Sequence, residues 1–128
     1  MPRILVADDN RVTAMMVAHL LREAGHEVLS ASDGDEALRL AARERPDLLV
    51  LDVLMPELDG FEVVRRLRED PALEPIPVIL LTGKSQQQDL EIGLAAGADE
   101  YLVKPFRPIQ LLEHVARLTG AAAPGRRR

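Results

Sequence analysis

Five short apolar segments alternate along this chain with segments whose apolar residues have helical spacing. The central apolar segment, residues 47–52, is apolar on both alternating faces, which is typical of a parallel strand covered by helices on both sides. Alternating strands and helices favour an α/β domain with a parallel sheet, right-handed crossovers and helices on both faces. The expected strands are residues 4–7, 27–31, 47–52, 78–81 and 101–103.

The segments between these strands carry helix signals. The first helix is predicted from apolar residues at i, i+4 spacing, namely Val12, Met16, Leu20 and Ala24. Asp33 and Glu36 have the spacing of a capping box, which predicts the start of the second helix. Pro108 suits the first turn of the last helix. The five helices are expected to begin near residues 10, 33, 59, 86 and 108.

Length and composition exclude several classes of protein. A chain of 128 residues with 47% hydrophobic residues is long enough for one packed domain. The absence of cysteine removes disulfides, thiolate zinc sites and a cysteine nucleophile. The net charge of −5 argues against a surface that binds nucleic acid.

The ends of the sequence set the expected domain bounds and compartment. Residues 1–119 are expected to form the domain, and residues 120–128 a flexible tail or the start of a linker. No apolar run approaches the roughly 20 residues of a membrane span. The N-terminus lacks the pattern of a signal peptide, so we expect a cytoplasmic protein with no membrane partner.

Polar and charged residues stand at the carboxyl ends of four expected strands. Asp8 and Asp9 follow the first, Asp52 ends the third, Thr82 follows the fourth and Lys104 follows the fifth. Because ligands of open α/β sheets bind beyond the carboxyl ends of the strands, we expect these side chains to meet in one site.

These residue types together indicate phosphoryl transfer. Three close carboxylates repel one another unless they hold a cation, and all-oxygen ligation points to Mg²⁺ or Mn²⁺. A cation beside a lysine and a hydroxyl can neutralise the charge that develops on a transferred phosphoryl group. Asp52 is the best candidate for a carboxylate nucleophile, because it ends the central strand with the other groups around it.

Five motifs in this order resemble the receiver domain of bacterial response regulators. They are residues 6–10, residues 51–56 with 59–60, residues 81–83, residues 97–99 and residues 104–106. The resemblance covers about residues 3–118. It implies a flavodoxin-like α/β fold, with a five-stranded parallel sheet of order 2-1-3-4-5 and five helices on both faces.

The resemblance also implies a role for each residue of the site. Asp52 would accept the phosphoryl group, and Lys104 would pair with Asp52 beforehand and later contact the phosphoryl group. Asp8 and Asp9 would hold Mg²⁺, one of them through water, and the backbone carbonyl of Leu54 would be a further ligand.

Further implied roles concern the response to phosphorylation. Thr82 would hydrogen-bond a phosphoryl oxygen, and Gly83 would leave room for it. Tyr101 would be an aromatic switch that turns inward as Thr82 moves, although plain packing is the other reading of this residue. The peptide bond between Lys104 and Pro105 is expected to be cis. The side chains of Leu54 and Lys84 would tune the lifetime of the phosphoryl group.

The implied partners are a histidine kinase or histidine phosphotransfer protein as donor, and an output domain or protein as target. The surface that switches would comprise the helix near 86–96, the strand 101–103 and the helix from Pro108, through which dimerisation is common in the family.

Three other functions compete with a phosphorylation switch. A phosphatase of the haloacid dehalogenase type would carry a second acid two residues after the nucleophile, where this chain has Leu54. A flavin or dinucleotide carrier would need a loop rich in glycine, or in serine and threonine, after the first strand, where residues 8–10 would instead repel a phosphate group. A phospho-independent pseudo-receiver usually lacks an acid, the threonine or the lysine, and none is missing here. No role is assigned to His19, His26 or His114.

Overall fold

The computed structural model describes residues 2–55, 58–83 and 96–120 of the chain. Five parallel strands form one sheet in the order β2-β1-β3-β4-β5. Their bounds are β1 Arg3–Ala7, β2 Glu27–Ala31, β3 Leu48–Asp52, β4 Val78–Thr82 and β5 Glu100–Val103. The expected strand order is confirmed, and each strand begins and ends within two residues of its predicted bounds.

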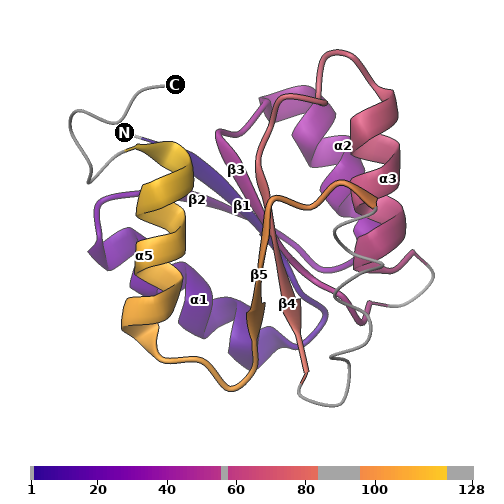
Figure 1. Cartoon of the computed structure of the whole chain (residues 1–128). Helices are drawn as coiled ribbons and strands as arrows, with labels where there is room; N and C mark the ends of the chain where they lie inside the picture. The colour runs from indigo at the N-terminus through magenta and orange to yellow at the C-terminus, as the bar shows by residue number, and fades with distance from the viewer. Residues whose placement is uncertain (1, 56–57, 84–95, 121–128) are drawn as a thin grey trace.

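Helices cover both faces of the sheet (Figure 1). Their bounds are α1 Arg11–Glu23, α2 Gly34–Glu44, α3 Gly60–Glu69 and α5 Pro108–Thr119. Helices α1 and α5 lie on one face and α2 and α3 on the other. The helix expected near 86–96 falls almost wholly outside the described residues. Within the described part of the chain, no helix is long and apolar enough to cross a membrane.

The sheet divides the core into two layers. Every residue of β3 and β4 is buried. Leu49 and Leu51 pack toward α2 and α3, whereas Leu48 and Val50 pack toward α1 and α5. Because each fully buried leucine contributes about 1.5–3 kcal/mol, this double burial explains why strand 47–52 is apolar on both faces.

Aspartates cap α2 and α3. Asp33 Oδ1 accepts a hydrogen bond of 2.8 Å from the Glu36 amide, and Asp59 Oδ1 accepts one of 2.9 Å from the Glu62 amide. The predicted capping box at α2 is therefore half right. The Glu36 carboxylate turns to the residue before the cap and accepts from the amide and hydroxyl of Ser32.

The helix α1 is confirmed, but of the four residues that predicted it only Leu20 packs against the core. Val12 and Met16 are 77% and 48% exposed, and the buried side chains are Val17, Ala18 and Leu21. This helix has apolar residues on more than one side, so two different sets of its residues have the i, i+4 spacing of a buried face. Packing against β1 and β2 selects only one of them.

The motif at residues 97–99 holds the start of β5, at the edge of the sheet opposite the acidic residues. Arg68 of α3 donates from Nε to the Gly97 carbonyl and from Nη2 to Asp99 Oδ2, both at 2.9 Å. The same Asp99 oxygen accepts from the Val78 amide at 2.8 Å. A side chain at residue 97 would meet Arg68 Cγ at 2.7 Å, which explains the glycine.

Candidate functional site

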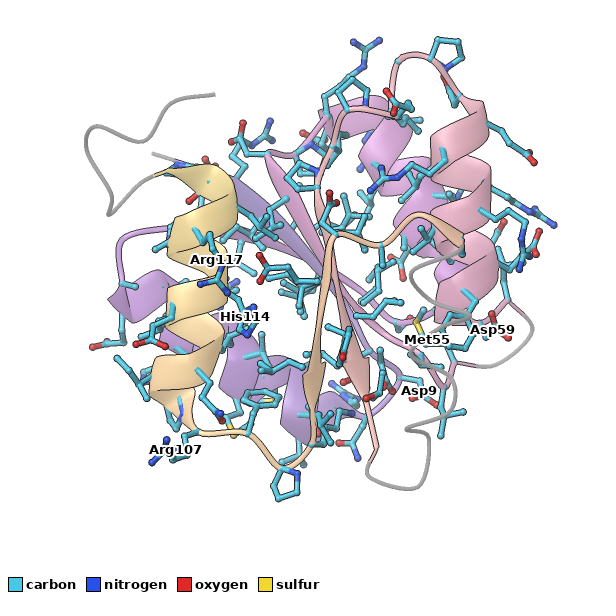
Figure 2. The ribbon with its side chains drawn as sticks, viewed as in Figure 1. Asp9, Met55, Asp59, Arg107, His114 and Arg117 are labelled. Atoms are coloured by element: carbon cyan, nitrogen blue, oxygen red, sulfur yellow. The ribbon has the colours of Figure 1, made fainter. Side chains whose placement is uncertain are left out.

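Four polar side chains from different strands meet at the carboxyl edge of the sheet. Asp8 directly follows β1, Asp52 ends β3, Thr82 ends β4 and Lys104 directly follows β5. Asp8, Asp52 and Thr82 are buried, with exposed fractions of 3%, 7% and 1%. Figure 2 shows Asp9 at the same edge of the sheet as Met55, which lies in the loop after β3.

Lys104 links the two buried carboxylates. Its Nζ lies 3.2 Å from Asp52 Oδ1 and 3.6 Å from Asp8 Oδ2. The Lys104 amide donates to the Thr82 carbonyl at 2.6 Å, which fixes the backbone from which this side chain extends. The cation therefore reaches the ends of β1 and β3 from the end of β5, as the sequence predicted.

Asp8, Asp9 and Asp52 form one acidic cluster. Each offers a carboxylate oxygen, and these oxygens all lie within 4.8 Å of one another. Each pair repels by about 1 to 4 kcal/mol at dielectric constants between those of water and a protein surface. Lys104 offsets one of three negative charges, so the cluster retains two, which matches the charge of one divalent cation.

One buried oxygen of the cluster has no hydrogen-bond donor among the described residues. Asp8 Oδ1 accepts from the Asn10 amide at 2.9 Å, but Asp8 Oδ2 is buried without a hydrogen bond from any described residue. Burying a charged oxygen without a hydrogen bond is costly, and Lys104 Nζ at 3.6 Å is too far away to donate one. Coordination to a cation would remove that cost. The donor set consists of oxygen atoms only, which fits a hard cation such as Mg²⁺.

The surroundings of Asp52 favour its protonated form. Burial is the largest cause, and the neighbouring Asp8 carboxylate adds to it, so the pKa of Asp52 is raised above its ordinary value of 3.8 although Lys104 opposes the shift. An ionised Asp52 is thus held at an energetic cost at neutral pH. A cation at the cluster would relieve that cost.

The cost of ionising Asp52 predicts that the stability difference between Asp52→Asn and the wild type depends on pH. A group whose pKa is raised in the folded state stabilises the fold below its unfolded pKa and loses that contribution as pH rises through the folded pKa. Without divalent cations, Asp52→Asn should therefore be more stable than the wild type at neutral pH, and the difference should shrink as pH falls toward 4. Urea unfolding across pH in the presence of a chelator measures this difference.

The control for this experiment is a carboxylate whose pKa is shifted in the opposite direction, so its replacement should change stability with the opposite sign. Hydrogen bonds from Arg117 and His114 lower the pKa of Glu100, so Glu100→Gln should be less stable than the wild type at neutral pH and approach it in acid. A wild type that is more stable than Asp52→Asn at neutral pH without divalent cations would contradict the cost assigned to Asp52.

The remaining predicted residues lie around this cluster. Thr82 Oγ1 is buried and has no hydrogen-bond partner among the described residues. The Leu54 side chain is 63% exposed, and Tyr101 is half-buried against the core layer of α2 and α3. The peptide bond between Lys104 and Pro105 is cis, as expected. Lys84 lies outside the described residues.

Two residues lie within the motifs that carry the resemblance but were given no role at the site. Asn10 caps α1 by accepting from the Thr13 amide at 3.0 Å, while its own amide holds Asp8. Gly60 lies so close to β3 that a Cβ atom would be 2.7 Å from the Asp52 carbonyl oxygen. An aspartate side chain often accepts a hydrogen bond from the backbone amide two residues later, so Asp8 in the sequence could have identified Asn10. The contact of Gly60 is long-range and has no local signal.

The chain is similar to known proteins along nearly its whole length. The family model of the response regulator receiver domain matches residues 4–116. The alkaline phosphatase synthesis transcriptional regulatory protein PhoP of Bacillus subtilis is 41% identical over 95% of this chain and 51% of its own length. The response regulator PleD of Caulobacter vibrioides is 42% identical over 91% of this chain and 26% of its own length.

Solved structures show the same similarity. A putative response regulator from Chloroflexus aurantiacus has a TM-score of 0.90 and 36% identity, covering 93% of this chain and 98% of its own. The receiver domain of a sensor histidine kinase from Pseudomonas aeruginosa has a TM-score of 0.87 and 35% identity, covering 94% and 98%. That structure has a magnesium ion coordinated in its active site cleft. The chain spans about half the length of the curated relatives that it matches first.

Proposed function

We propose a function from the premise that this chain belongs to the family of response regulator receiver domains, which are signalling switches. The chain accepts a phosphoryl group on Asp52 in a reaction that depends on Mg²⁺. The donor is a phosphohistidine of a histidine kinase or histidine phosphotransfer protein. The domain catalyses its own phosphorylation and dephosphorylation and no reaction of another substrate.

One observation carries this proposal. Lys104 Nζ lies within 3.6 Å of both Asp8 and Asp52, at a cluster in which the carboxylates of Asp8, Asp9 and Asp52 are within 4.8 Å. An anionic nucleophile and an anionic phosphoryl donor repel each other, so the site must supply positive charge from more than one side. Lys104 supplies it from one side, and the acidic cluster can hold a cation on the other.

The transfer forms one bond to phosphorus and breaks another. An oxygen of Asp52 forms a bond to the phosphorus atom of the donor, while the bond from phosphorus to the donor imidazole nitrogen breaks. That nitrogen keeps the electron pair and takes a proton from solvent. Lys104 offsets the charge on the transferred oxygens, and positioning accounts for most of the remaining acceleration.

The acidic cluster suits Mg²⁺, which keeps several waters and takes one or two carboxylates together with phosphate oxygens. Asp8 and Asp9 would hold the ion, one of them through water, with Asp52 and the Leu54 carbonyl as further ligands. When bound, the ion neutralises negative charge on the phosphoryl oxygens. Mn²⁺, which prefers similar ligands, is expected to substitute.

The response begins at Thr82. Its hydroxyl is buried without a partner among the described residues, so a new phosphoryl oxygen would give it one. Thr82 pairs with Val103 in the sheet, and Leu80 pairs with Tyr101. Because these strands are hydrogen-bonded, a shift of β4 at this edge would also displace β5. We propose that Tyr101 turns inward and that β5 and α5, with the segment before β5, form the altered surface.

Switching of this kind has a definite energetic requirement. A change from 1% to 99% of the active conformation needs about 5.5 kcal/mol of differential stabilisation. Charge-assisted hydrogen bonds contribute about 1.5–3 kcal/mol each, so new bonds to Thr82 and Lys104 together with the cation reach much of that amount. The altered surface would then act on an output domain or protein, or pair with a second copy of the chain.

The test of the switch uses beryllofluoride, which mimics an acyl phosphate on a carboxylate. With Mg²⁺ present, we expect binding to wild-type protein and shifts of the NMR signals of Thr82 and Tyr101. The variant Thr82→Val keeps the shape of the side chain without the hydroxyl and should bind beryllofluoride without the shift of Tyr101. Shifts confined to Asp8, Asp9 and Asp52 would contradict the switch.

Leu54 predicts a slow loss of the phosphoryl group. Its apolar side chain has no polar group that could orient an attacking water molecule, and it is 63% exposed beside the site. We expect Leu54→Asn to dephosphorylate several-fold faster than the wild type after the donor is removed. Time courses of phosphorylated protein measure both rates, with Leu54→Met as a control that should resemble the wild type. An unchanged or slower rate in Leu54→Asn would count against this role.

A further inference from the structure

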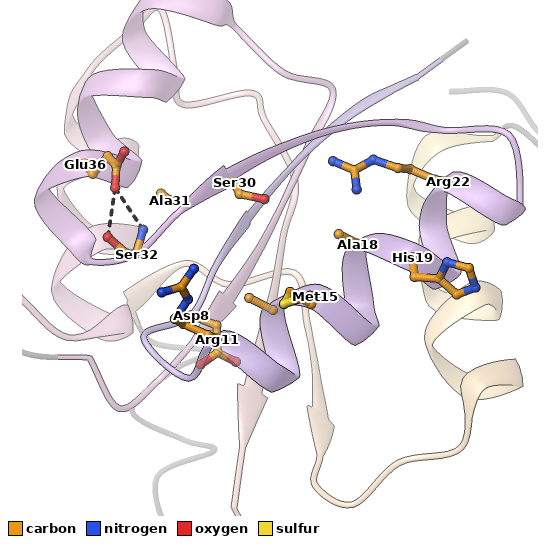
Figure 3. A pocket seen from close by; sticks show the side chains of 11 residues that line it. Asp8, Arg11, Met15, Ala18, His19, Arg22, Ser30, Ala31, Ser32 and Glu36 are labelled. Atoms are coloured by element: carbon orange, nitrogen blue, oxygen red, sulfur yellow. Dashed lines mark hydrogen bonds between the residues drawn. The ribbon is translucent and has the colours of Figure 1, made fainter.

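A cavity beside the acidic site, with which it shares Asp8, lies between α1 and the edge strand β2. It has a volume of about 540 Å³, within the range of sites that bind small molecules. The helix contributes Ala14, Met15 and Ala18, and the strand side contributes Ser30 and Ser32 (Figure 3). The cavity therefore has an apolar floor and hydroxyl groups along one wall.

Small side chains create this cavity. Val28 packs against the core layer of α1 and α5, and Ser30 follows on the same face of β2 but is exposed. On the facing helix, Ala18 is buried and fills little volume. Interiors of proteins are close-packed, so small residues on both sides leave space that a larger pair would have filled.

Two arginines provide the charge of the cavity. Arg11 and Arg22 both line it, and both extend from α1 into the opening in Figure 3. Neither guanidinium group makes a hydrogen bond or ion pair with any described residue, in contrast to those of Arg3, Arg68 and Arg117. Eleven residues separate them along the helix, or roughly 16 Å at 1.5 Å per residue.

The two acids that line the cavity are already engaged. Asp8 accepts from the Asn10 amide at 2.9 Å and lies 3.6 Å from Lys104 Nζ. Glu36 accepts from the amide and hydroxyl of Ser32. Among the charged groups that line the cavity, the two guanidinium groups thus lack a partner within the described residues, and the charge that would complement them is negative.

We propose that this cavity binds a small, elongated organic dianion. Its two carboxylate or phosphate groups pair with Arg11 and Arg22, and its apolar middle lies on Ala14, Met15 and Ala18. Arginine favours such groups because its planar guanidinium donates two parallel hydrogen bonds. Met15 is 68% exposed and unbranched, so it can adapt to the apolar part of the ligand. The proposal does not depend on phosphorylation at Asp52.

A series of straight-chain α,ω-dicarboxylates, from succinate to sebacate, tests the proposal at constant ionic strength and without divalent cations. Backbone NMR signals of Ala18 and Ser30 should shift saturably, and affinity should peak at the chain length that spans the two arginines. Inorganic phosphate has a single anionic centre and should bind more weakly. Equal affinity along the series, or no saturable shift, would overturn the proposal.

Variants separate this site from nonspecific binding. Loss of a charge-assisted hydrogen bond should weaken binding about tenfold in Arg22→Gln. Ser30→Leu should fill the cavity and abolish binding, whereas Arg43→Gln changes an exposed arginine of α2 that does not line the cavity and should bind like the wild type. Asp52→Asn should also bind normally, which keeps this test independent of the phosphorylation site. Binding unchanged in Arg22→Gln would overturn the assignment, as would binding of an extended acidic peptide without any response to the dicarboxylates.

Discussion

Replacing Asp52 by asparagine is expected to abolish incorporation of the phosphoryl group while leaving the fold intact. The amide oxygen of asparagine is a poor nucleophile, so no acyl phosphate can form at this residue. The fold should persist because the substitution removes a carboxylate that is held at a cost beside Asp8. Incorporation from acetyl phosphate with Mg²⁺, followed by intact-protein mass spectrometry, measures the loss.

The matched control changes an aspartate outside the cluster. Asp35 lies on α2 with a side chain 63% exposed, and it pairs with Arg39. Asp35→Asn should incorporate phosphate like the wild type. An acyl phosphate that still forms at the wild-type rate in Asp52→Asn would remove Asp52 from its proposed role, whereas loss of incorporation in both variants would indicate a general defect.

Gly60→Ala should lower the free energy of unfolding by about 3 kcal/mol, the upper part of the range for overpacked cores. The added Cβ would lie 2.7 Å from the Asp52 carbonyl oxygen and 3.0 Å from Val53 Cα, and backbone atoms cannot yield as a flexible side chain can. Thermal unfolding should show a decrease of roughly 10 °C in Tm. Because β3 carries Asp52, the rate of phosphorylation should fall as well.

A second glycine separates steric overlap from backbone strain. Gly25 has φ of 98°, a backbone conformation that favours glycine, and a Cβ there would have no atom within 4 Å. Gly25→Ala should cost only the strain, about 1–2 kcal/mol, and should leave the rate of phosphorylation unchanged. Equal destabilisation in the two variants would show that contact with β3 is not what requires Gly60.

The strand order and the positions of the site residues could be predicted because their signals are local. Each strand is a short apolar run that ends at a polar residue, and parallel strands place their carboxyl ends at one edge. Asp8, Asp52 and Lys104 therefore came together as expected, although 44 and 52 residues separate them in sequence. The resemblance of five motifs to one family added the roles that spacing alone could not assign.

Features decided by tertiary contacts could not be predicted in the same way. The buried face of α1 depends on packing against β1 and β2, because this helix carries apolar residues on more than one side. Glu36 bonds to Ser32 rather than to the amide of the cap residue, because the chain before α2 brings Ser32 within reach. Gly60 and the cavity beside Ala18 arise from approaches between segments distant in sequence.

The most direct test of the central claim is chemical trapping of the acyl phosphate. Borohydride reduces an aspartyl phosphate to homoserine, and peptide mass spectrometry then identifies the modified residue. After reaction with acetyl phosphate and Mg²⁺, we expect homoserine at residue 52 alone and none when a chelator replaces Mg²⁺. Homoserine at residue 8 or 9, or equal modification of residue 52 without a divalent cation, would contradict the account of this site.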